Sequence, residues 1–111
     1  EWGKAINLGD SINTSSDEKC VFIHPNGKLL FFTSEGHDTM GSYDIFVSKK
    51  VNGKWSKAQN MGYPINTVKE EKTISVTRDG KTGYISASYK DSKGGSDIYK
   101  IDLTNLNLLA K

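Results

Sequence analysis

Residues 7–14 read Asn-Leu-Gly-Asp-Ser-Ile-Asn-Thr, and residues 60–67 read Asn-Met-Gly-Tyr-Pro-Ile-Asn-Thr, the same pattern 53 positions later. The match continues without a gap to residues 44–46 and 97–99, which read Asp-Ile-Phe and Asp-Ile-Tyr. A period of this length is typical of one supersecondary unit used twice, as in propellers, solenoids and other arrays. Residues that recur in both copies are therefore expected to build the unit rather than to form a single active site.

Each copy is predicted to form four strands and almost no helix, because no segment shows a 3.6-residue apolar period. The first three strands are expected at 20–24, 29–34 and 44–48 in copy one, and at 73–77, 82–88 and 97–101 in copy two. Asn-Gly ending at Gly27 and Asp-Gly ending at Gly80 supply the positive φ values that tight hairpin turns need. A fourth strand begins at Trp55, and Trp2 heads the equivalent N-terminal segment.

Four antiparallel strands in about fifty residues are typical of a β-propeller blade. We predict an all-β fold of two four-stranded antiparallel blades, a partial β-propeller, with an extra N-terminal strand. Residues 1–7 would be the outer strand of a preceding or partner blade, 8–60 repeat one with its outer strand, and 61–111 repeat two. Two blades do not close a ring. Three arrangements therefore stay open: a piece of a longer propeller, self-association of chains through open blade edges, or two sheets packed as a compact sandwich.

Three motifs carry a family resemblance: Trp-x4-Asn-Leu-Gly-x2-Ile-Asn-Thr from Trp2, Pro-Asn-Gly-Lys from Pro25, and Gly-x-Tyr-Asp-Ile-Phe from Gly41. Together they resemble the WD-like, TolB-type propeller repeats of OmpA-family cell-envelope proteins of Bacteroidetes. The resemblance covers residues 1–103. It implies a periplasmic or outer-membrane-associated module that binds protein partners of the cell envelope. It does not extend to an OmpA-like domain, so it implies no peptidoglycan binding.

Composition narrows the function classes. The net charge of +2 and the lack of a basic cluster argue against nucleic acid, and no apolar stretch is long enough for direct membrane insertion. The single cysteine, Cys20, excludes an internal disulfide and a cysteine-based metal cluster. No phosphate-binding loop or nucleophile elbow is present, and neither His24 nor His37 recurs in copy two. We therefore expect no enzyme, no catalytic residues, no metal and no cofactor.

Four candidate binding residues lie where the linker meets the first strand of each copy. Glu18 and Glu71 precede these strands, which in a propeller places them near the mouth of the central channel, where they would recognise a ligand. The linker residues Asn13 and Asn66 lie beside them in the same pattern. The structural alternative is that the two glutamates accept hydrogen bonds from the Asn-Thr linkers and fix the docking of one blade on the next.

Acidic residues also recur before the third strand. Asp38 and Asp91 lie in polar loops and complete the set of candidate binding residues, although the loops are too poor in oxygen ligands for a typical calcium site. Asp44 and Asp97 begin the strands, and their expected role is to cap backbone N–H groups of the preceding turn. The residues assigned to the structural repeat motif are Trp2, Trp55, Gly27, Gly80, Asp44 and Asp97.

The predicted function is a non-catalytic protein-interaction or scaffold module, in which rigid strands present the loops 35–42 and 89–96 on one rim and the linkers on the other. One alternative is a carbohydrate-binding module, with an exposed tyrosine such as Tyr63 or Tyr89 beside acidic residues. A second is a hydrolase completed only in a full propeller, which requires two carboxylates that converge in a pocket.

Overall fold

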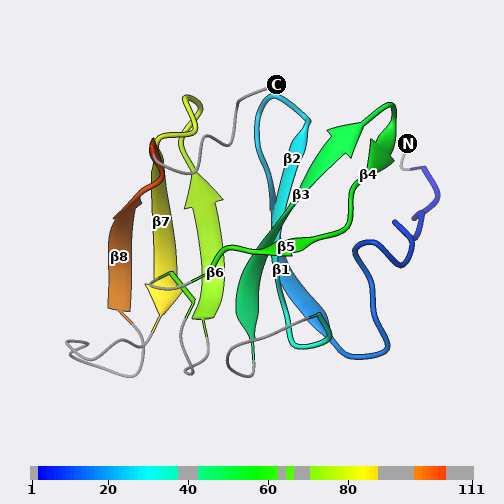
Figure 1. The fold of residues 1–111 in the computed structure, drawn as a ribbon, viewed down its shortest axis with the longest axis horizontal. Coiled ribbons are helices and arrows are strands. Elements are labelled where there is room, and N and C mark those ends of the chain that lie inside the picture. The colour runs from blue at the N-terminus through cyan, green and yellow to red at the C-terminus, as the bar shows by residue number, and fades with distance from the viewer. Residues whose placement is uncertain (1–2, 38–42, 63–64, 67–70, 88–96, 105–111) are drawn as a thin grey trace.

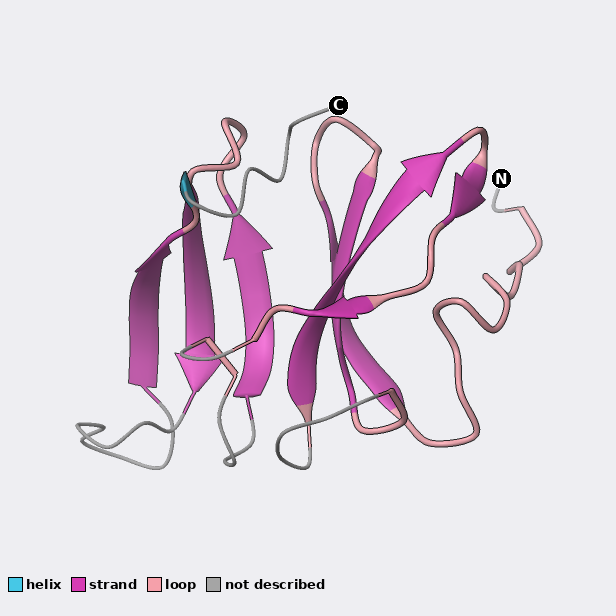
Figure 2. Ribbon diagram, in the orientation of Figure 1, coloured by secondary structure: helices cyan, strands magenta, loops and turns pink. Residues whose placement is uncertain are grey.

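The computed structural model describes residues 3–37, 43–62, 65–66, 71–87 and 97–104. These residues form two antiparallel sheets joined by turns and linkers, without an α-helix in the described ranges (Figures 1 and 2). The all-β class is therefore confirmed, and none of the described segments is a helix able to cross a membrane. The strands are β1 Glu18–Ile23, β2 Leu29–Ser34, β3 Asp44–Val51, β4 Lys54–Trp55, β5 Gln59–Asn60, β6 Glu71–Val76, β7 Thr82–Ala87 and β8 Asp97–Asp102.

The two sheets repeat each other in strand position and in register. The first sheet has the order β1-β2-β3-β4, with β5 also paired to β3, and the second has the order β6-β7-β8. Thr33 pairs with Ile45 in the first sheet, and Ser86 pairs with Ile98 at the matching place in the second. The hairpin glycines match as well, with φ of 73° at Gly27 and 74° at Gly80. The 53-residue period is therefore a period of structure.

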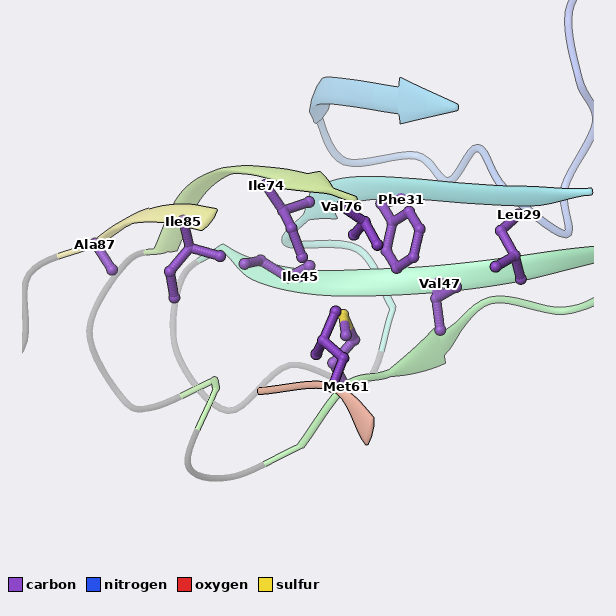
Figure 3. Close-up of a cluster of buried hydrophobic side chains, with 10 residues drawn as sticks. Leu29, Phe31, Ile45, Val47, Met61, Ile74, Val76, Ile85 and Ala87 are labelled. Atoms are coloured by element: carbon purple, nitrogen blue, oxygen red, sulfur yellow. The ribbon is translucent and has the colours of Figure 1, made fainter. Parts of the chain in front are cut away.

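The main hydrophobic core lies between the two sheets (Figure 3). The first sheet and its linker contribute Leu29, Phe31, Ile45, Val47 and Met61. The second sheet and the residue after β8 contribute Ile74, Val76, Ile85, Ala87 and Leu103. We call this contact the junction. Each large aliphatic or aromatic side chain that it removes from water stabilises the fold by roughly 2 kcal/mol before entropy costs.

The strand β2 is buried on both sides, which distinguishes it from its counterpart β7. One set of β2 side chains points into the junction, and the alternate set, Leu30 and Phe32, packs with Ile12 and Phe46 in a second cluster on the other side of the sheet. We call this other side the open face. In β7 only one side is buried, and Tyr84 is exposed on the other.

A buried histidine directly after β1 joins the two copies across the junction. His24 is 2% exposed, and its Nε2 lies 3.0 Å from the carbonyl oxygen of Thr77, the residue at the equivalent position of copy two. Its Nδ1 accepts a hydrogen bond from the Asn26 N–H at 3.2 Å, so the proton that bonds to Thr77 is carried on Nε2. No contact of His24 was predicted from the sequence.

The predicted N-terminal strand does not form, since residues 3–9 are in no strand. The equivalent segment of copy one ends in Gln59–Asn60, which is a strand because it pairs with Val47 and Phe46 of β3. Within the described ranges, no strand lies beside residues 3–9 in the place that β3 takes beside β5. The segment lies along the side of the first sheet that faces away from the second (Figure 1).

Candidate functional site

A groove of about 340 Å³ lies on the open face, between the N-terminal segment and the strands β1 and β2. Its lining consists of residues 6–8, 12–13 and 18–21 together with Leu30 and Phe32. Two of the predicted binding residues, Glu18 and Asn13, are brought together here. Most of the other side chains in the lining are apolar, so the groove suits an apolar surface better than a sugar or an ion.

Exposed aliphatic side chains surround the groove. Val21 is 69% exposed, Ile23 53%, Ile6 82% and Leu8 45%. Single exposed apolar residues are ordinary, but a contiguous group around an apolar groove marks an interaction surface. These residues were not among the predicted binding residues. The signal that indicates them is the unbroken apolar run Val21-Phe22-Ile23, which is typical of a strand meant to be buried on both faces.

Glu18 lies at one end of the groove and is held by the linker. Its carboxylate accepts hydrogen bonds from the Thr14 N–H at 3.0 Å, the Thr14 hydroxyl at 2.6 Å and the Ser34 hydroxyl at 2.8 Å. Burial raises the pKa of Glu18. The hydrogen bonds from Thr14 and Ser34 and the charge of His37 together lower it by more than burial raises it, so the net pKa lies below its ordinary value. These contacts are the ones expected from the structural alternative, in which Glu18 accepts hydrogen bonds from the linker.

His37 fixes the linker beside the second cluster. Its ring lies 5.9 Å from that of Phe32 and 5.2 Å from that of Phe46, and its Nε2 is 2.7 Å from the Ile12 carbonyl oxygen. Beside it is a second hollow of about 430 Å³, lined by Gly36, His37, Phe46 and residues 57–60. Among the described residues of this lining there is no carboxylate, so these residues do not include a histidine–carboxylate pair for acid–base chemistry.

Asn66 lies in the core rather than on a rim. Its Oδ1 accepts a hydrogen bond from the Ile45 N–H at 2.7 Å, and its Nδ2 donates to the Ile45 carbonyl oxygen at 2.8 Å and to the Asn60 Oδ1 at 2.7 Å. The residue is fully buried. The Asn66 amide therefore bonds to both the backbone N–H and the backbone carbonyl of Ile45 in β3. These bonds hold in place the linker that leads to the second sheet.

The remaining predicted residues lie apart from the groove. Asp44 is buried, and its Oδ2 accepts a hydrogen bond from the Asn60 Nδ2 at 2.9 Å, a tie across strands that the sequence did not indicate. The turn that Asp44 was expected to cap falls in residues 38–42, outside the described part. Trp55 is half-buried against the second cluster, with the Lys50 Nζ 5.5 Å from its ring centre.

Several predictions fall where the structure gives no side-chain description. Trp2, Asp38 and Asp91 lie outside the described residues, and for Glu71 only its place at the start of β6 is described. Asp97 begins β8 as predicted for a repeat residue and is partly buried. Within the described ranges no three histidine, cysteine, aspartate or glutamate side chains are grouped to hold a metal ion.

A scan of protein-family models, a search of curated proteins and a search of solved structures each found no match for this chain. The functional reading therefore rests on the residues and their geometry.

Proposed function

We propose that the chain is a non-catalytic protein-interaction module, a partial β-propeller whose open face receives another protein surface. The observation that carries this proposal is the apolar groove on the open face with its border of exposed aliphatic side chains, above all Val21 and Ile23. Burial of such a surface is favourable by about 25 cal/mol per Å², which makes a protein surface the natural occupant.

The path of the chain supports the propeller interpretation. The outer segment of the first sheet, β4 and β5, runs along β3 and then continues through Asn66 to β6, the first strand of the second sheet. Successive antiparallel sheets that face each other and are linked from the outer strand to the next inner strand are the arrangement of neighbouring blades.

The chemistry of the groove favours a protein over a small polar ligand. Glu18, its acidic residue, already accepts three hydrogen bonds from Thr14 and Ser34. A carboxylate satisfied in this way is a weak recognition group for a sugar hydroxyl, because binding would exchange existing bonds for equivalent ones. The proposed partner is a protein of the bacterial cell envelope, in the periplasm or at the outer membrane. This location rests on the resemblance of the repeat motifs alone.

The test is a capture experiment followed by reconstitution. The immobilised chain is exposed to an envelope extract, the captured protein is purified, and its affinity is measured by calorimetry. The double variant Val21→Asp/Ile23→Asp should bind at least tenfold more weakly. Val51→Asp, at an exposed valine near the end of β3 outside the groove lining, is the matched control and should bind like the wild type. Equal binding by both variants would contradict the proposal, as would glycan binding in place of protein binding.

A further inference from the structure

The open face of the first sheet is the structural equivalent of the junction face of the second. A shift of 53 positions places Val21 on Ile74 and Ile23 on Val76. Ile74 and Val76 are 6% and 5% exposed because the first sheet covers them, whereas Val21 and Ile23 are 69% and 53% exposed.

The side of the second sheet that faces away from the first, which we call the far face, is in turn equivalent to the junction face of the first sheet. Phe31 and Ile45 of the first sheet are fully buried in the junction, and the same shift places them on Tyr84 and Ile98. Tyr84 is 44% exposed and Ile98 is 74% exposed. One chain therefore presents both halves of the junction a second time. One half is the open face of the first sheet, and the other is the far face of the second sheet.

The linker that fastens the junction is also present twice. Asn66 N–H donates to the Gly62 carbonyl at 2.8 Å, and Asn13 N–H donates to the Gly9 carbonyl at the same distance. Behind each asparagine, the glycine N–H donates at 2.7 Å to the side chain of Asn60 or Asn7. The Asn13 Nδ2 reaches the Asn7 Oδ1 at 3.2 Å, as Asn66 reaches Asn60. Asn13 therefore has the same local arrangement as Asn66. We call this arrangement, an asparagine held by the preceding glycine and asparagine of the linker, the asparagine hook.

The hook of Asn13 lacks only the strand on which Asn66 closes. In the first sheet that strand offers the N–H and carbonyl of Ile45, which point away from β2. Because β8 pairs with β7 in the same register, the N–H and carbonyl of Ile98 point away from β7. In the described part of the chain, no second strand pairs with β8 on that side.

We propose that the open face binds the far face of a second copy of this chain, with the Asn13 amide closing on the backbone N–H and carbonyl of Ile98 in that copy. The contact is head-to-tail, so it propagates into a ring or an open row rather than a symmetric dimer. It contains fewer apolar side chains than the junction, since Val47 is replaced by Lys100 at the equivalent position, and it is expected to form only at higher protein concentration. The inference rests on the proposed function, because it names the protein that the open face binds.

The test uses light scattering and two blocked variants. The wild-type chain should increase in mass with concentration. Val21→Asp blocks the open face and Ile98→Asp blocks the far face, so each alone should remain monomeric, and an equimolar mixture should give a one-to-one dimer. Asn13→Ala should weaken assembly at least tenfold, Val51→Asp should assemble like the wild type, and circular dichroism checks that every variant is folded.

Three outcomes would overturn the inference: a wild-type chain that remains monomeric at its solubility limit, blocked variants that fail to combine, or assembly that Asn13→Ala leaves unchanged. Its failure is separable from failure of the proposed function. A monomeric chain that still binds an envelope protein through Val21 and Ile23 keeps the function and loses the second copy. Assembly without any envelope partner keeps the second copy and removes the envelope role.

Discussion

The same surface occurs twice in this protein, once buried and once open. Ile74 and Val76 are covered by the first sheet, while Val21 and Ile23, their equivalents 53 positions earlier, lie beside a groove. The difference shows that the exposure of the first pair follows from what lies next to the sheet rather than from the sheet itself. A repeat protein buries the apolar faces of its units only against neighbouring units.

The largest expected effect comes from truncating equivalent side chains on the two sides of this comparison. Ile45→Ala removes a fully buried junction side chain and should lower the free energy of unfolding by about 3 kcal/mol. Ile98→Ala, at the exposed equivalent, should change it by less than about 0.5 kcal/mol in dilute solution. Urea unfolding measures both, and similar losses would show that Ile98 is buried in a way the structure does not contain.

The two asparagine hooks should differ nearly as much. Asn66→Ala leaves the buried N–H of Ile45 without its partner, while the Ile45 carbonyl keeps only its bond from the Met61 N–H, and the change should cost about 2 kcal/mol. Asn13→Ala breaks one exposed side-chain bond to Asn7 and should cost less than about 0.5 kcal/mol in the dilute chain. Thermal unfolding at low concentration checks the pair, and a large loss from Asn13→Ala would mean that this hook already holds the monomer together.

The hairpin turns, in contrast, should respond alike. Gly27 and Gly80 adopt nearly the same positive φ, so an alanine at either position meets the same backbone strain. Each substitution should destabilise the fold by about 1 kcal/mol. Calorimetry of Gly27→Ala and Gly80→Ala gives the comparison, and a difference well above this size would indicate that one turn carries an additional contact.

The smallest expected effect concerns pH. Because the folded pKa of Glu18 lies below its ordinary value of 4.5, its hydrogen bonds stabilise the fold above that pH, and the contribution is lost as the pH falls through the lower folded pKa. Glu18→Gln should therefore flatten the loss of stability in acid. Unfolding midpoints of the wild type and Glu18→Gln between pH 3 and 6 test this, and an unchanged acid profile in the variant would contradict it.

Strand positions could be predicted from the sequence because turn chemistry and alternation are local. The glycines at positions 27 and 80 set the hairpins, and the 53-residue shift gave matching strands in both copies. The partners of these strands could not be predicted in the same way. That residues 3–9 form no strand, that His24 bonds to Thr77, and that Asn66 closes on Ile45 all depend on how two sheets meet.

The candidate site shows the same division. The local contact between Glu18 and the linker follows from a spacing of four residues to Thr14, and the sequence indicated it. The groove does not follow from spacing, because its floor joins Ile12 of the linker to Leu30 and Phe32 of β2. Which face of β2 points to the junction and which stays open is decided only when the second sheet packs.

The most direct measurement of the central claim is amide hydrogen exchange at two residues, Ile45 and Ile98, across a range of protein concentrations. Ile45 N–H bonds to Asn66 within the chain and should be protected at every concentration. Ile98 N–H, its equivalent, should exchange rapidly in dilute solution and become protected as the concentration rises, and Asn13→Ala should abolish that protection. Exchange at Ile98 that does not depend on concentration would contradict the claim that the open face and the far face are two halves of one junction.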